Sequence, residues 1–140
     1  MTATIATGLV AELLAAAARR PDEEICGLLI GEGGDIRRAL PAANVSPRPA
    51  DSFEIDPAVL IAALRAERAG GPAVLGCYHS HPRGPAIPSP RDLAAAEPGR
   101  LWLILAGDVA RLWRRHAEDF TEVAFHAMAA DGPAGPPAGG

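Results

Sequence analysis

A single residue separates His79 from His81, and a hydroxyl and a carboxylate follow them at Ser89 and Asp92. On an extended backbone, side chains two residues apart point to the same side, so both imidazoles should face one way. Two imidazoles and a carboxylate are ligands that a catalytic zinc ion takes when it keeps a fourth position open for water. This spacing therefore predicts a metal-dependent hydrolase.

Each of these residues also has a simpler explanation. A lone histidine near a strand end is usually a hydrogen-bonded polar residue, and Ser89 and Asp92 fit the start of a helix as N-cap and capping-box partner. Three prolines, at 82, 85 and 88, stiffen the connection and hold the helix start against the strand end at reduced entropic cost. Capping is compatible with catalysis, because local bonds already hold an N-cap hydroxyl in place.

Such a site needs a general base that is not itself a ligand, because a proton must reach the leaving group. Glu23 and Glu24 stand directly before an apolar run at residues 25–30. A carboxylate from either position could enter the cleft from a neighbouring strand. Spacing alone does not choose between them, and a solvated charge between helix and strand is a fair interpretation of Glu23.

The elements that must position these residues alternate between helices and strands. Apolar periodicity, helix-forming residues and the Asp56-Pro57 start signal predict helices over residues 7–20, 57–69 and 90–96. Short apolar runs bounded by turn residues predict strands over residues 25–30, 35–45, 53–55, 73–79, 101–106 and 109–115, and residues 120–128 form a final strand or short helix. The pattern favours an α/β or α+β layered domain.

Length and composition limit the architecture and the partners. A chain of 140 residues, 49% hydrophobic and 21% charged, fits one globular domain, which we expect to span residues 1–128. The Pro- and Gly-rich tail over residues 129–140 should be disordered. A net charge of -4 with 13 scattered basic residues, all of them arginine, does not suggest a nucleic-acid partner.

Cysteine usage and the N-terminus indicate the compartment. Cys26 and Cys77 both lie in apolar runs, which favours two buried free thiols in a reducing environment. The N-terminus lacks the charged region and apolar segment of a signal peptide, and no apolar run is long enough to cross a bilayer. We therefore expect a cytoplasmic protein that does not bind membranes.

The motif resembles that of the JAMM (JAB1/MPN/Mov34) metalloprotease family. The family signature is an upstream Glu, then His-x-His, seven residues, Ser, two residues and Asp. This chain fits it without a gap at His79, His81, Ser89 and Asp92, and Glu24 stands in the base position of an upstream Glu-x-Cys-Gly segment that also resembles the family. The resemblance covers roughly residues 5–128, which makes it far more specific than an isolated metal-binding motif.

The resemblance implies a mechanism and a fold. Zinc would be held by His79, His81 and Asp92, and Glu24 would take a proton from the zinc water and pass it to the departing amine. Ser89 would donate a hydrogen bond to the tetrahedral oxyanion, a contact that strengthens as negative charge develops. The fold implied is a curved mixed β-sheet flanked by helices, the cytidine deaminase-like JAB1/MPN arrangement.

The resemblance also implies a class of substrate. The family's eukaryotic deubiquitinases carry insertions that grip ubiquitin, whereas residues 46–51 and 80–89 are short here. The chain is more similar to stand-alone bacterial members, which act at the C-terminus of ubiquitin-like sulfur carrier proteins on a peptide or isopeptide bond. Two alternatives are a catalytically silent MPN-type binding module, which the complete set of five residues disfavours, and a zinc amidohydrolase acting on a small substrate.

Overall fold

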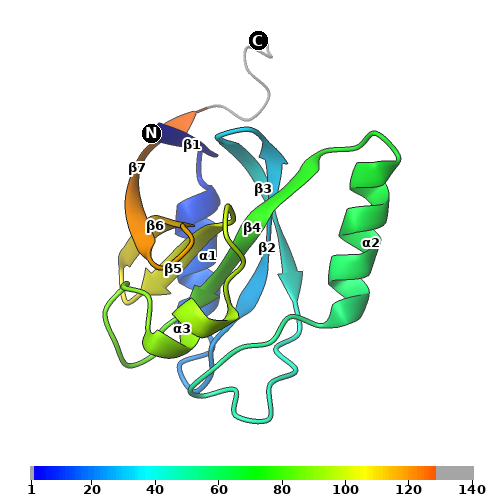
Figure 1. Cartoon of the computed structure of the whole chain (residues 1–140). Helices are drawn as coiled ribbons and strands as arrows, with labels where there is room; N and C mark the ends of the chain where they lie inside the picture. The colour runs from blue at the N-terminus through cyan, green and yellow to red at the C-terminus, as the bar shows by residue number, and fades with distance from the viewer. Residues whose placement is uncertain (1, 129–140) are drawn as a thin grey trace.

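The sheet of this protein curves until its two ends meet (Figure 1). The computed structural model describes residues 2–128, and the tail predicted to be disordered, residues 129–140, lies outside them. Within that range the strands are β1 (Thr2–Ala6), β2 (Cys26–Glu32), β3 (Asp35–Ala42), β4 (Ala73–Ser80), β5 (Leu101–Ala106), β6 (Val109–Arg115) and β7 (Phe120–Met128). The helices are α1 (Leu9–Ala18), α2 (Pro57–Arg68) and α3 (Pro90–Ala95).

The sheet contains both parallel and antiparallel strand pairs. The order is β1-β3-β2-β4-β5-β6-β7, and β1 closes it by pairing in parallel with β7 as well as with β3. β4 pairs in parallel with β5, and the remaining neighbours are antiparallel. This curved mixed sheet flanked by helices confirms the predicted α+β architecture.

The helices cover opposite faces of the sheet. α1 packs on one face, where Leu13 joins the largest cluster of buried side chains from the strands. α2 packs on the other face through Ala63 and its neighbours, and on that same face Ala96, directly after α3, packs against Cys77 and Trp102. Cys77 of β4 also points to this face. Because side chains two residues apart on a strand share a face, His79 should lie on it too, and with it the predicted site.

Local signals account for the helix starts. The Asp56 carboxylate accepts a hydrogen bond from the Ala58 N–H at 3.0 Å, and Pro57 occupies the first position of α2. α3 begins in the same way, with Ser89 as the N-cap and Pro90 next. Both helices begin at the residues that the sequence predicted.

Strand β4 is held on both of its edges. β2 pairs with it on one side and β5 on the other, and at Gly76 an added Cβ would overlap the Leu101 carbonyl of β5. Glycine therefore allows the close parallel approach of the two strands. The pairing continues past the end of β4, because His81 N–H donates to the Leu105 carbonyl at 2.8 Å.

Two sequence expectations differ from the structure. β1 was not among the predicted strands, and the strand predicted over residues 53–55 is only an isolated bridge between Asn44 and Ile55. The segment between β3 and α2 is otherwise irregular, and it leaves Phe53 beside the end of β4. The ambiguous residues 120–128 form a strand.

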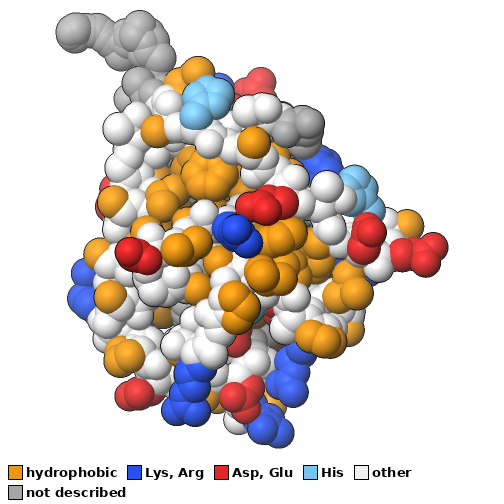
Figure 2. Space-filling view, turned by 90° about the vertical axis from the view of Figure 1, so that its left-hand side faces the viewer, with side chains coloured by type: hydrophobic (Ala, Val, Ile, Leu, Met, Phe, Trp, Pro, Cys, Tyr) orange, Lys and Arg blue, Asp and Glu red, His pale blue; other side chains and the backbone are white. Residues whose placement is uncertain are grey.

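The surface over β6 and β7 mixes apolar and charged side chains. Figure 2 shows apolar side chains gathered around a few charged ones on the face that lies to the left in Figure 1. Val109 and Met128 are exposed on these strands, and Arg111 pairs with Glu122 across them at 3.5 Å. No helix within residues 2–128 is both long and apolar enough to cross a membrane.

Candidate active site

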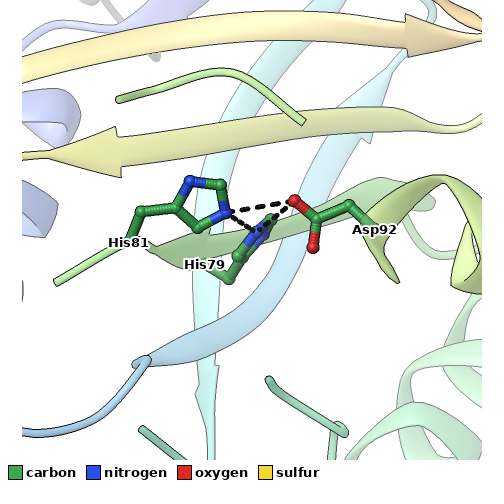
Figure 3. A group of neighbouring side chains, drawn as sticks. All are labelled: His79, His81 and Asp92. Atoms are coloured by element: carbon green, nitrogen blue, oxygen red, sulfur yellow. Dashed lines mark hydrogen bonds and ion pairs between the residues drawn. The ribbon is translucent and has the colours of Figure 1, made fainter. Parts of the chain in front are cut away.

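Three side chains from β4, the residue after it and α3 converge on one point (Figure 3). Nε2 of His79 lies 3.0 Å from Nε2 of His81, and Asp92 Oδ2 lies 3.3 Å and 3.1 Å from these two nitrogens. A tetrahedral zinc ion with bonds of about 2.0–2.1 Å holds its ligand atoms about 3.3 Å apart. The spacing and the donor types of the three residues therefore fit such an ion.

The capping box of α3 positions the Asp92 carboxylate. Asp92 N–H donates to the Ser89 hydroxyl oxygen at 3.0 Å, and Ser89 N–H donates to Asp92 Oδ2 at 2.9 Å. Burial would raise the pKa of Asp92, but hydrogen bonds from His79 and His81, together with the Ser89 amide, hold this pKa well below its ordinary value. The carboxylate is thus ionised at neutral pH, as a metal ligand must be.

The two imidazoles differ in their surroundings. The Pro85 carbonyl lies 2.8 Å from His81 Nδ1 and can only accept, so Nδ1 carries a proton, and in the neutral imidazole Nε2 would face the site with its lone pair. Burial opposes protonation of His81, but its bonds to Asp92 and Pro85 outweigh burial and raise its pKa. His79 is fully buried, and burial lowers its pKa, which favours the neutral form that binds metals.

Strand register brings Glu24 to the same point. Cys26 of β2 is paired with His79 of β4, and Ser80 N–H donates to the Ile25 carbonyl at 3.0 Å. Continuing this antiparallel pairing one residue further sets Glu24 opposite His81. Glu23 instead forms an ion pair with Arg20 at the surface, with 2.6 Å between the charged groups. The structure thus brings Glu24, and not Glu23, to the histidines.

The Glu24 carboxyl is buried and poorly solvated. Only 5% of the residue is exposed, and Oε1 has no hydrogen-bond partner among residues 2–128. Burial raises the pKa of Glu24 from 4.5 to about 7, although the nearby charge of His81 lowers it. A carboxyl group with a pKa near the operating pH can both accept and release a proton.

Glu24, His81 and Ser89 line one cleft of about 320 Å³. Its remaining walls are the Pro-rich segment after His81 and, across from it, the loop at Ala50 and Asp51. No sequence pattern predicted that this loop would lie at the site. The five residues of the sequence motif do lie together. His81 belongs both to this cleft, with Glu24 and Ser89, and to the group that it forms with His79 and Asp92.

Phe53 and Asn44 also contribute and were not foreseen. The Phe53 ring stacks on the His79 imidazole, with centroids 4.3 Å apart. The Asn44 amide donates to the Glu24 carbonyl at 2.9 Å and so ties the start of β2 to the end of β3. An aromatic residue three positions before the helix start signal Asp56-Pro57 was the available hint for Phe53, because the chain is only 4% aromatic.

The position of Glu24 predicts a pH-dependent stability in the metal-free protein. Because the pKa of Glu24 rises from 4.5 to about 7 on folding, its contribution to the free energy of unfolding is fully present below pH 4.5. This contribution is lost as pH rises through about 7. A pKa shift of this size lowers the free energy of unfolding by about 3 kcal/mol over that pH range. Urea unfolding across this range should show the loss in wild type relative to Glu24→Gln, which cannot ionise. An unchanged difference between the two proteins at every pH would contradict the burial of this carboxyl.

Comparison with known proteins connects this geometry to a family. The sequence model described as prokaryotic homologs of the JAB domain matches residues 6–116. A "Probable TtuB-protein conjugate cleaving protease" of Thermus thermophilus is 42% identical over 89 residues, which are 64% of this chain and 60% of that protein. A "Desampylase" of Haloferax volcanii is 36% identical over 95 residues, 66% of this chain and 68% of that one. The match thus spans only about three fifths of the Thermus protein's length.

Solved structures give the same picture of the fold. A solution structure of a Desulfitobacterium hafniense protein superimposes with a TM-score of 0.78 at 29% identity, covering 92% of this chain and 94% of that one. A JAB1/MPN domain protein from Archaeoglobus fulgidus gives a TM-score of 0.59 at 20% identity, covering 89% and 97%. At that identity the second likeness concerns the fold alone.

Proposed function

Because this chain belongs to the family of prokaryotic JAB domain homologues, we propose that it is a cytoplasmic zinc-dependent peptidase or isopeptidase. Its substrate is the C-terminus of a ubiquitin-like or sulfur carrier protein. The observation that carries the proposal is the convergence of His79, His81 and Asp92 beside the buried carboxyl of Glu24. The names of the Thermus and Haloferax relatives, a conjugate-cleaving protease and a desampylase, support the substrate class.

His79, His81 and Asp92 would hold the metal. A zinc ion in such a site supplies the positive charge that lowers the pKa of a water molecule to roughly 7. The protein's own part is to keep three ligands in their binding forms. The Pro85 carbonyl does this for His81, burial does it for His79, and the capping box does it for Asp92.

Glu24 moves the proton. Its carboxylate takes a proton from the attacking water and delivers it to the amine that leaves the carrier protein. Burial, which raises the pKa of Glu24 to about 7 in the metal-free protein, favours a carboxyl group that can both take up and release a proton. Hydrogen bonds hold both backbone polar groups of Glu24. Its N–H donates to the Pro49 carbonyl at 2.7 Å, and its carbonyl accepts from the Asn44 amide. The carboxyl therefore stays in the cleft although Oε1 has no hydrogen-bond partner in the described part of the chain.

Ser89 has a proton to donate. Its hydroxyl oxygen accepts from the Asp92 N–H, and this leaves the O–H free to point into the cleft that Ser89 lines. There the hydroxyl would donate to the oxygen on which negative charge develops during attack. The capping bond holds the donor in place before the substrate arrives, which is what makes such donors effective.

Ser89→Ala should lower kcat by about 100- to 1000-fold, because one oxyanion donor is lost. It should also lower the free energy of unfolding by about 1 kcal/mol through loss of the cap. Asp56→Ala, which removes the cap of α2 away from the site, is the matched control for stability alone. Steady-state kinetics and urea unfolding of both variants separate the two effects. Equal activity in the two variants would reduce Ser89 to a helix cap.

The function itself is tested with a ubiquitin-like sulfur carrier protein that carries a C-terminal peptide extension, and with the same carrier linked to a lysine side chain. Zinc-reconstituted protein should release the carrier, ending in Gly-Gly, from one or both substrates, as read by intact mass. Chelator-treated protein is the control. Zinc-loaded protein that binds the carrier but leaves both bonds intact would indicate a silent binding module instead.

A further inference from the structure

The two histidines at the site are oriented in different ways. The Pro85 carbonyl fixes His81 through Nδ1, the kind of bond that commonly orients a ligating imidazole. Nδ1 of His79 is buried and has no hydrogen-bond partner among residues 2–128. Nε2 of His79 meets His81 and Asp92 at the site, so the Nδ1 side of the ring is oriented by packing.

Aromatic rings supply that packing. The Phe53 ring stacks on the His79 imidazole at 4.3 Å between centroids, with 19° between the planes. Trp102 meets the same imidazole edge-on, at 5.1 Å and 83°. Stacked and edge-to-face arrangements are the geometries that aromatic pairs prefer. The His79 ring is thus confined by two neighbours at a large angle to each other.

The two neighbours are anchored differently. Trp102 belongs to β5 and is held by strand pairing on both sides. Phe53 lies in the irregular segment before α2, where the Asn44 side chain bonds to the residues on either side of it. Asn44 Nδ2 donates to the Ser52 carbonyl at 3.0 Å, and Asn44 Oδ1 accepts from the Glu54 N–H at 3.1 Å. The Asn44 side chain therefore presents Phe53 to the imidazole.

We propose that Phe53 is a positioning residue that keeps Nε2 of His79 directed at His81 and Asp92. The inference rests on the metal site in the proposed function and deepens it. Without the Phe53 ring the His79 imidazole gains freedom to turn, because no hydrogen bond holds Nδ1 within residues 2–128. A ligand that must first be turned into place binds the metal more weakly.

Phe53→Leu should weaken zinc binding by about 10-fold or more, since losing an outer partner of a ligand costs about 10- to 100-fold. Competition with a chromophoric chelator measures this affinity without any reference to activity. The visible absorption of the Co²⁺-loaded protein should also change, because it reports ligand geometry. Phe53→Tyr keeps the ring and should restore both readouts to those of wild type.

Phe120→Leu is the matched control. Phe120 is a half-buried aromatic residue like Phe53, and it packs edge-on against Trp102 with centroids 5.4 Å apart. Its loss removes a ring from the same cluster without removing the one stacked on His79. We expect lower thermal stability and unchanged zinc affinity. Phe53→Met provides a second, flexible replacement in case the leucine variant does not fold.

The outcomes separate this inference from the proposed function. Wild-type protein that binds no zinc would overturn both. Wild type that binds zinc while folded Phe53→Leu or Phe53→Met binds it equally well would overturn the positioning role alone. The same holds if Phe120→Leu weakens zinc binding as much as Phe53→Leu does, because the effect would then belong to the whole cluster.

Discussion

Glu24→Gln is expected to lower kcat by about 100- to 10,000-fold, the usual contribution of a general acid–base group. Zinc content should remain that of wild type, because Glu24 lies beside the three proposed ligands and is not one of them. Glutamine has nearly the same shape and fills the same buried position, but it cannot accept a proton. Kinetics on a carrier-protein substrate, together with metal analysis of the same sample, measure both quantities.

Glu23→Gln is the control for this change. It removes the same charge one residue earlier, where the side chain forms an ion pair with Arg20 at the surface. Because exposed ion pairs contribute little, at most about 1 kcal/mol, stability should hardly change. Activity should match wild type. An active Glu24→Gln protein would show that another group moves the proton.

His81→Ala is expected to abolish both zinc binding and hydrolysis. The change removes one of the three proposed ligands. The loss of zinc affinity should therefore exceed the loss of about 10- to 100-fold that follows removal of a residue that only orients a ligand. The fold should survive, because His81 lies one residue past β4 at the edge of the cleft and the site's other residues keep their own bonds. Metal analysis after zinc reconstitution gives the first readout, and circular dichroism checks the fold.

His126→Ala controls for the loss of a histidine. His126 is exposed on β7 and takes no part in the group at His79. It should keep wild-type zinc content and activity. If His81→Ala protein retained stoichiometric zinc, the ligand assignment from the motif would be wrong and the site would have to be sought elsewhere.

Local signals were sufficient for the helices and hairpins. Asp56-Pro57 and Ser89-Pro90 predicted the starts of α2 and α3, and both signals act within one turn of the chain. β1 escaped prediction because its five residues are stabilised by parallel pairing with β3 and β7, strands far away in the sequence. Long-range pairing of this kind leaves no local pattern in so short a segment.

The site was predicted in part from its motif and in part only by resemblance. Spacing was enough to expect that His79, His81 and Asp92 would meet, and the match to the JAB domain family confirms the resemblance. Spacing could not choose Glu24 over Glu23, because that choice depends on the register between β2 and β4. The catalytic and ligand roles of these residues stay predictions until the variants are measured.

Phe53 shows why the remaining part could not be predicted. Residues 53–55 have the composition of a strand, but the predicted strand is only an isolated bridge. The Asn44 side chain forms hydrogen bonds with the backbone on both sides of Phe53, and these bonds take the place of strand pairing. The ring then turns to His79 instead of joining a sheet. Side-chain hydrogen bonds between residues 8 and 10 positions apart decide this outcome, and a single sequence does not reveal them.

The double pairing of β4 has a consequence for how the site opens. Amide hydrogens in a strand bonded on both edges exchange with solvent only through large-scale opening, whereas a short helix held by its cap opens at lower cost. His79 and the amide of His81 belong to the first class, and Asp92 on the six-residue α3 belongs to the second. The side of the site that carries Asp92 is therefore the side that opens more easily. Exchange of a bound metal should follow local opening of α3 rather than opening of the sheet.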